Sequence, residues 1–529
     1  MMEDGRKIIE EGRAVIGIEL GSTRIKAVMV DKGGRILAKG AFAWENHLVD
    51  GVWTYGLEEA WDGLQKCYAS LREDVRKRYG VELRRAASIG ISGMMHGYLP
   101  FDGEGRQLAP FRTWRNNMTG EAAAALTELF QYNIPQRWSI AHLYHAMLRK
   151  EAHVPEVRFL TTLAGYVHWK LTGRKCLGIG EASGMFPMDI AAGNYHQGML
   201  DKFDELVREQ GFDWKIRDIL PEVLLAGSPA GTLTEEGAKL LDVSGSLEAG
   251  IPMCPPEGDA GTGMVATNSV RVRTGNISAG TSAFAMLVLE RELSRLHENL
   301  DMVTTPSGKL VAMAHSNNCS TAINAWAGIF AECLRSFGVE KDMDEVYGTL
   351  FRKAEEGAAD CGGLMAYCFY SGEHGVGLTK GCPMVLHPPE AEFTLANLMR
   401  TQIYTAFAAM KLGIDTLVKE EKVSIDRVVG HGGIFKTPGV AQKILAAAIH
   451  APVAILETAG EGGAWGIALL AAYLSKASEL SLEDYLDKEI FGEYQAREIE
   501  PDPSEEAGYE EFIRRYRKYL EAESLAANS

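Results

Sequence analysis

The sequence lacks the features that mark several large classes of protein. None of its 8 cysteines forms a CxxC pair or another zinc-type spacing, which favours free thiols in a reducing compartment. No run approaches the roughly 18–20 apolar residues of a membrane span. The charged start, MMEDGRKIIEEGR, contains no apolar signal core. We therefore expect a cytoplasmic protein with no membrane partner.

Basic residues are too few for a nucleic-acid-binding surface. The 529 residues carry 54 Lys and Arg against 71 Asp and Glu, which gives a formal net charge of −17. Because contact with a phosphate backbone needs clustered positive charge, we expect no nucleic-acid partner. The hydrophobic content of 46% is ordinary for a globular chain, and the length fits two or three domains.

One kind of segment is present twice. Residues 14–31, AVIGIELGSTRIKAVMVD, and residues 272–288, VRTGNISAGTSAFAMLV, each read as an apolar run, a Gly/Ser/Thr turn and a second apolar run. This pattern predicts two β-hairpins. Glycine lets a hairpin tip approach a ligand closely, and hydroxyls beside exposed N–H groups suit phosphate. Two such tips indicate two related lobes with a nucleotide between them.

The order of the other predicted elements is typical of α/β lobes. We expect a loose, charged leader at 1–12, an N-terminal lobe at 13–267, a C-terminal lobe at 268–480 and an acidic tail with a packing helix at 481–529. The predicted strands lie at 15–20, 25–30, 35–40, 86–92, 251–256, 427–429 and 453–455. The predicted helices lie at 57–79, 121–130, 141–150, 161–171, 201–210, 320–337, 392–419, 440–450, 462–474 and 509–523.

Two carboxylates accompany these turns. Glu19 ends the first strand beside a hydroxyl-bearing turn, where it can organise Mg²⁺ on a phosphate; an ordinary hairpin with a solvent-facing Glu is the alternative. Asp259 stands in a Gly-flanked loop, GDAGT, and can take a proton from a substrate hydroxyl. An Asp in this context is more often a turn former, but its place at the seam between the lobes favours function.

Three further loops carry groups suited to a sugar or a nucleoside. The segments SGMMHGY at 92–98 and FRTWRNN at 111–117 offer imidazole and amides for hydroxyls and an indole for the C–H face of a sugar. A buried His and a core Trp are the alternatives for these residues. The segment GHGGIFK at 430–436 follows a strand, and its glycines can admit a base and ribose against the backbone.

Taken in this order, the segments resemble the FGGY family of carbohydrate kinases, in particular its xylulokinase-like members. The resemblance rests on GIELGSTRIKAV, ISGMMHG, LTGRKCLGIGEASGMFPMD, GDAGTG, SAGTS, YSGE, HGGIFK and EGGAWGIALLAA, and it covers nearly the whole chain. It implies an α/β fold of two actin/hexokinase-like (ribonuclease H-like) lobes with an ATP cleft between them.

The resemblance also implies roles for individual residues. Asp259 is expected to be the general base, and Glu19 to hold Mg²⁺, directly or through water. The expected cofactors are ATP and Mg²⁺, the partner is a small-molecule sugar, and a homodimer is left open as the assembly. The expected contacts are Gly21, Ser22, Thr23, Gly280, Thr281 and Ser282 for the phosphates, Gly432 and Gly433 for the adenosine, and Met95, His96, Trp114, Asn116 and Asp259 for the sugar.

Two departures from the family pattern concern the metal and the sugar. Glu19 replaces the usual Asp of the first phosphate motif, and Asn116 replaces the Asp of the Trp-x-Asp loop. The predicted reaction is phosphorylation of a ketopentose such as D-xylulose, because of Met95-His96-Gly97. Other acceptors are L-ribulose, L-xylulose, L-fuculose and a glycerol-like polyol. A nucleotide-dependent sugar sensor without turnover is the alternative of another class, and Asp259 argues against it.

Overall fold

The computed structural model describes residues 4–456, 462–492 and 497–528, and the chain divides into two compact units. Unit 1 comprises Met1–Val270, Met302–Val311 and Gly460–Tyr494, and unit 2 comprises Arg271–Asp301, Ala312–Ala459 and Gln495–Ser529. The chain therefore alternates between the units. The boundaries predicted at 267 and 480 do not take this alternation into account.

The main sheet of unit 1 has the strand order β13-β6-β1-β2-β3. The hairpin predicted at residues 14–31 is confirmed, since β1 (Val15–Leu20) and β2 (Arg24–Val30) pair antiparallel. β3 (Ile36–Ala43) continues antiparallel to β2, whereas β6 (Ser88–Gly93) pairs parallel to β1 and β13 (Glu257–Gly258) pairs parallel to β6. The parallel strands bring their carboxyl ends to the edge of the sheet where the hairpin turns.

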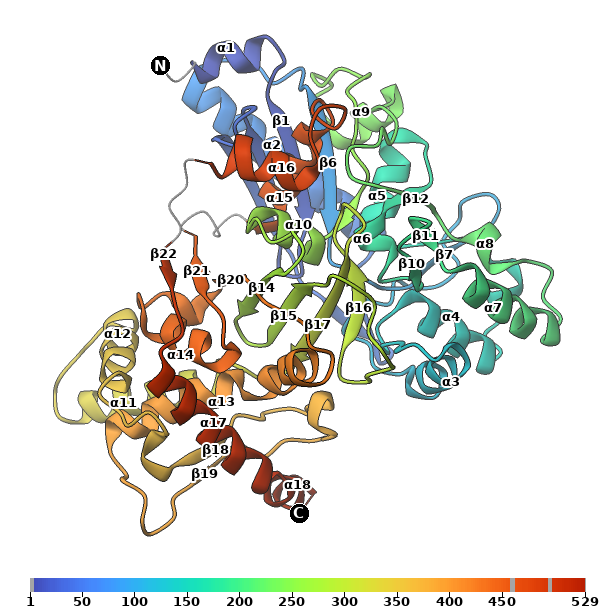
Figure 1. The fold of residues 1–529 in the computed structure, drawn as a ribbon. Helices are drawn as coiled ribbons and strands as arrows, with labels where there is room; N and C mark the ends of the chain where they lie inside the picture. The colour runs from blue at the N-terminus through green and yellow to red at the C-terminus, as the bar shows by residue number, and fades with distance from the viewer. Residues whose placement is uncertain (1–3, 457–461, 493–496, 529) are drawn as a thin grey trace. The chain divides into compact units, whose positions relative to one another are not determined.

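Helices cover both faces of this sheet. α2 (Leu57–Tyr79) packs against β2 and β3, and α15 (Gly462–Tyr473) packs against β1 and β6 (Figure 1). Gly17 explains the close approach of α15, because a Cβ at this position would lie 2.2 Å from the backbone oxygen of Ala464. Its register partner on β6, Gly90, faces the same helix at Ile467.

The structure corrects three sequence predictions in unit 1. The leader expected to be loose contains α1, and Ile8 and Ile9 are buried. The predicted helix 161–171 begins later, because β8 precedes it. The predicted strand 251–256 forms only isolated bridges at Pro252 and Met253, since its prolines cannot donate to a ladder. The other elements of unit 1 are α1 (Gly5–Glu10), β4 (His47–Val49), β5 (Val52–Thr54), β7 (Leu99–Phe101), α3 (Gly120–Phe130), α4 (Ser139–Leu148), η1 (Val154–Glu156), β8 (Phe159–Thr161), α5 (Leu163–Thr172), β9 (Cys176–Gly178), α6 (Ile179–Ala182), β10 (Met188–Asp189), β11 (Asn194–Tyr195), α7 (Gln197–Glu209), α8 (Ile216–Ile219), β12 (Glu222–Leu224), α9 (Glu235–Leu241), α10 (Asp259–Ala266), β16 (Asp301–Thr304), α16 (Leu482–Tyr485) and η7 (Leu486–Ile490).

The sheet of unit 2 repeats the pattern of unit 1, with the order β17-β15-β14-β20-β21-β22. The second predicted hairpin is confirmed, since β14 (Thr274–Ala279) and β15 (Ala283–Val288) pair antiparallel. β20 (Arg427–His431) is parallel to β14, β21 (Val453–Ile455) is parallel to β20, and β22 (Arg497–Ile499) is antiparallel to β21. A hairpin followed by two parallel strands is thus common to both sheets. β17 spans Leu310–Ser316.

Helices and short turns complete unit 2. In the described residues of both units, no helix is long and apolar enough to cross a lipid bilayer. The remaining elements are α11 (Thr321–Ser336), α12 (Met343–Ala354), η2 (Cys361–Gly363), β18 (Met365–Tyr367), η3 (His374–Val376), β19 (Met384–Leu386), α13 (Leu395–Asp415), the π-turn η4 (Thr416–Glu420), η5 (Gly433–Phe435), α14 (Val440–Ile449), α17 (Pro503–Lys518) and α18 (Leu520–Asn528).

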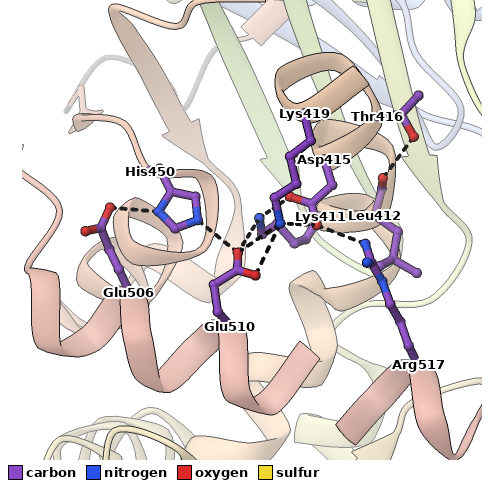
Figure 2. A network of polar contacts seen from close by, with 9 residues as sticks. All are labelled: Lys411, Leu412, Asp415, Thr416, Lys419, His450, Glu506, Glu510 and Arg517. Atoms are coloured by element: carbon purple, nitrogen blue, oxygen red, sulfur yellow. Dashed lines mark hydrogen bonds and ion pairs between the residues drawn. The ribbon is translucent and has the colours of Figure 1, made fainter. Parts of the chain in front are cut away.

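A network of charged side chains joins α17 to α13 and to the end of α14 (Figure 2). His450 lies between two carboxylates of α17, with Nδ1 2.8 Å from Glu506 and Nε2 2.9 Å from Glu510. Lys411, which is buried on α13, donates to Glu510 at 3.1 Å and also pairs with Asp415. Buried aromatic residues of α17, such as Tyr509, complete the packing of the helix predicted in the tail.

Candidate active site

Asp259 lies at the end of β13 and is the first residue of α10, whereas the sequence predicted a loop. One of its carboxylate oxygens, Oδ1, accepts a hydrogen bond of 3.1 Å from the backbone N–H of Met95. Burial raises the pKa of Asp259, and backbone hydrogen bonds such as that from Met95 oppose the rise. The side chain is partly exposed. Asp259 is therefore an accessible carboxylate with increased affinity for a proton.

The loop after β6 brings Met95 next to Asp259, and His96 follows Met95 in the chain. His96 has a φ of 72°, a left-handed backbone conformation that is uncommon for residues other than glycine. Its Nδ1 donates to the carbonyl oxygen of Gly184 at 3.1 Å, and its ring stacks on Trp138 with centroids 6.4 Å apart. Such strain persists only where the surroundings hold it in place, which marks the loop as a functional-site candidate.

Glu19 is the second carboxylate of the site, near the end of β1. Burial and the negative charge of Asp259 raise its pKa to about 7, although Lys26 and a backbone hydrogen bond from Ala464 act in the opposite direction. A Cβ at position 463 would lie 2.5 Å from Glu19 Oε1. Gly463 at the start of α15 therefore leaves the space that a Glu needs.

The carboxylates fit a hydrated magnesium ion. The repulsion between Asp259 and Glu19 is the kind of interaction that a cation relieves. Among the described residues, no three His, Cys, Asp or Glu side chains are grouped as a metal centre. A magnesium ion here would take most of its ligands from phosphate and water, as this ion usually does in nucleotide sites.

Two buried acids behind Asp259 were not identified from the sequence. Glu257 accepts the backbone N–H of Glu181 at 2.8 Å, and burial raises its pKa to about 8. The Glu181 carboxyl is fully buried; burial and the charges of Asp259 and Glu257 keep its pKa well above its usual range. The sequence does show an acidic residue, Glu257, directly before Gly258-Asp259. Nothing in the sequence indicated that its side chain is buried.

The first hairpin tip, Gly21–Thr23, is held by aromatic side chains. Trp44 Nε1 donates to the carbonyl oxygen of Gly21 at 2.7 Å, and the Tyr55 hydroxyl donates to that of Ser22 at 2.6 Å. Trp114 Nε1 reaches Ser22 Oγ at 3.3 Å, while its side chain stays 41% exposed. The structure thus joins Trp114, expected at the sugar, to a residue expected at the phosphates.

Asn116, which the sequence analysis placed at the sugar, is bound by the backbone of its own unit. Its Oδ1 accepts from the backbone N–H of Trp53 at 2.9 Å, and its Nδ2 donates to the carbonyl oxygens of Trp53 and Thr113 at 2.8 and 2.9 Å. Both ends of the amide are therefore used by the backbone, and the side chain is buried. Asn116 holds the turn that carries Trp114, and its contact with the sugar stays a prediction.

In unit 2 the second tip, Gly280–Ser282, lies beside the turn predicted to receive adenosine. Gly432 has a φ of 114°, and a Cβ there would lie 2.2 Å from the backbone oxygen of Ala279. A Cβ added at Gly280 or at Gly433 would meet no atom of the described residues within 4 Å, so their backbone leaves both positions open. The predicted phosphate and adenosine segments are therefore neighbours in this unit.

Comparison with known proteins agrees with this geometry. The model of the FGGY family of carbohydrate kinases matches with its N-terminal domain at residues 14–265 and with its C-terminal domain at residues 275–475. A xylulose kinase of Staphylococcus xylosus is 21% identical over 87% of this chain and 90% of that protein. A xylulose kinase of Escherichia coli is 24% identical, and the match spans 53% of this chain and 55% of that protein.

The fold is shared with solved structures. The xylulose kinase of Rhodospirillum rubrum superposes with a TM-score of 0.78 at 18% identity, over 96% of this chain and 99% of that one. This likeness shows the two-domain α/β fold of the actin/hexokinase type. Since both family domains match in sequence and together span most of its length, this chain belongs to the FGGY family of carbohydrate kinases.

Proposed function

We propose that this sugar kinase transfers the γ-phosphoryl group of MgATP to a hydroxyl of a ketopentose, with D-xylulose as the first candidate. The observation that carries the proposal is the hydrogen bond from Met95 N to Asp259 Oδ1, 3.1 Å long. It joins the carboxylate expected to act as the base to the loop expected to bind the sugar. A nucleotide sensor would need no such base.

Asp259 acts as the general base in this proposal. It accepts the proton of the sugar hydroxyl, and its raised pKa makes it a better acceptor than an exposed Asp. Met95, His96 and Trp114 hold the sugar so that this hydroxyl lies within hydrogen-bond reach of the carboxylate. When bound, MgATP supplies the phosphoryl group and the positive charge that stabilises its transfer.

The residues expected to bind the nucleotide keep their roles in this proposal. Glu19 holds Mg²⁺ through water. The tips Gly21–Thr23 and Gly280–Ser282 border the phosphates with their open backbone and with the hydroxyls of Ser22, Thr23, Thr281 and Ser282, as anion nests do. Gly432 and Gly433 border the adenosine, where the open backbone beside Gly433 supports the assignment. The assembly, for which the sequence left a homodimer open, stays untested.

The choice of D-xylulose rests on the relatives named xylulose kinases and on Met95-His96. Its test is a coupled ADP-release assay over D-xylulose, L-ribulose, L-xylulose, L-fuculose and glycerol, with Asp259→Asn as the inactive control. We expect the highest kcat/KM for D-xylulose. A higher value for another acceptor would refute the sugar assignment, and ATP binding without turnover of any acceptor would refute the kinase assignment.

A further inference from the structure

A short loop holds the second hairpin tip, Gly280–Ser282 of unit 2, through two backbone hydrogen bonds. It comprises residues 316–320, from the last residue of β17 to the residue before α11. The backbone N–H of Cys319 donates to the carbonyl oxygen of Thr281 at 2.9 Å, and that of Ser320 donates to the carbonyl oxygen of Gly280 at 3.0 Å. Both carbonyl groups of the tip are therefore directed toward this loop.

Because the peptide bond is planar, these two hydrogen bonds also set the direction in which the N–H groups of the tip point. In a trans peptide the C=O of one residue and the N–H of the next point in opposite directions. With the carbonyls of Gly280 and Thr281 fixed on the loop, the N–H groups of Thr281 and Ser282 are directed away from it. These are the donors that the proposed function assigns to phosphate.

The loop is in turn fixed by the buried carboxylate of Glu373. Its Oε2 accepts from Ser316 Oγ at 2.9 Å and from Asn318 N and Nδ2 at 3.2 and 3.0 Å, while its Oε1 accepts from Asn317 N at 3.1 Å. Asn318 completes the connection, since its Oδ1 accepts from the backbone N–H of Tyr370 at 2.9 Å. Four donors on three consecutive residues thus converge on one side chain.

We propose that Glu373 is the positioning residue of the second phosphate tip: its carboxylate fixes the loop 316–320, which directs the N–H groups of the tip toward the nucleotide. The inference rests on the proposed function for the identity of the ligand. Glu373 touches no reacting atom in this account. It acts through the loop, and its removal should weaken nucleotide binding without affecting the sugar.

Unit 2 contains a second buried carboxylate, Glu421, whose substitution serves as a control for a general loss of stability. Glu421 is also buried and also accepts several hydrogen bonds, from Ser294 N and Oγ at 2.8 Å each and from His297 Nε2 at 2.6 Å. Its partners follow the far end of β15, which is about 17 Å along the strand from the tip. Loss of Glu421 should destabilise unit 2 and leave the tip in place.

The test compares Glu373→Gln with Glu421→Gln in the full chain. A glutamine at 373 must turn its NH₂ toward the N–H of Asn317 or of Asn318, because donors face both carboxylate oxygens. We expect the Kd of ADP, measured by calorimetry, and the KM of ATP to rise about tenfold, as for loss of a charged hydrogen-bond acceptor. The KM of the sugar should stay within about twofold. Glu421→Gln should lower the melting temperature and change neither constant.

The proposal is overturned if Glu373→Gln leaves the Kd of ADP unchanged, or if both variants weaken ADP equally. Should Glu373→Gln not fold, Ser316→Ala removes one of the four donors; a rise of about threefold in the Kd of ADP supports the proposal, and no change refutes it. Because ADP binding is measured without turnover, a wild-type chain that binds ADP but phosphorylates no sugar would refute the proposed function alone.

Discussion

Glu19→Gln should change how the stability of unit 1 depends on pH. The pKa of this carboxyl is raised from 4.5 to about 7 in the folded protein by burial and by the charge of Asp259. Between these values the native state keeps a proton that the unfolded chain has already released. Raising the pH through this window therefore favours unfolding, and glutamine, which does not titrate, removes the effect.

The size of the effect follows from the shift. The difference of about 2.5 pKa units corresponds to about 3 kcal/mol at high pH, of which about 2.5 kcal/mol accumulates between pH 5 and pH 8. The wild-type chain should lose this amount of unfolding free energy over that range, relative to the variant. The local contacts should survive the change, since glutamine keeps an oxygen that can accept the hydrogen bond from Ala464.

Urea unfolding followed by tryptophan fluorescence measures this difference in the absence of metal and nucleotide. The signal reports mainly on unit 1, because of the 9 tryptophans only Trp326 lies in unit 2. Glu205→Gln, an exposed position on α7, serves as the control and should follow the wild type. Parallel pH profiles for Glu19→Gln and the wild type would show that Glu19 titrates normally, and the reasoning about its burial would be wrong.

Three further predictions concern the base, the packing of α15 and the network of Figure 2. Asp259→Asn should lower kcat by about 10²–10⁴-fold in the ADP-release assay and leave sugar binding intact; an active variant would exclude Asp259 as the base. Gly17→Ala should destabilise unit 1 by about 1–3 kcal/mol in urea unfolding, because its Cβ would meet the backbone of Ala464; unchanged stability would contradict this packing. In Glu510, burial alone would raise the pKa, but hydrogen bonding to His450 and the charge of Lys411 lower it to about 2. Glu510→Gln should therefore cost about 1 kcal/mol at neutral pH, discounted for partial exposure. Hydrogen exchange of α17 should show this loss shrinking as the pH falls from about 4.5 toward 2, and a loss that does not change with pH would exclude Glu510 as its source.

The sequence allowed the local elements near the site to be predicted because they are set by neighbouring residues. The apolar run of β1 and the helical spacing of α2 predicted Val15–Leu20 and Leu57–Tyr79 with the bounds that the structure has. Both hairpins also follow from their own turns. Asp259, Met95 and His96 could be selected because each lies in a short motif, and the structure brings them together.

Other parts of the site depend on contacts between distant segments, which no local pattern reveals. Asn116 looked available, yet the backbone of Trp53, on a strand 63 residues earlier, uses its amide. Glu181 and Glu257 became site residues only through burial, and the sequence shows charge but not burial. The place of α15 on the sheet of unit 1 depends on the close approach at Gly17, since α15 begins 445 positions later (462 − 17).

The late position of α15 in the chain has a consequence for biosynthesis. A nascent polypeptide on the ribosome displays the first sheet long before the helix that covers one of its faces has been translated. Until the segment from 460 onward emerges, apolar residues on that face are open to solvent, which is a hazard for aggregation. The first unit should therefore complete its folding only near the end of translation, and a fragment limited to residues 14–265 should depend on chaperones.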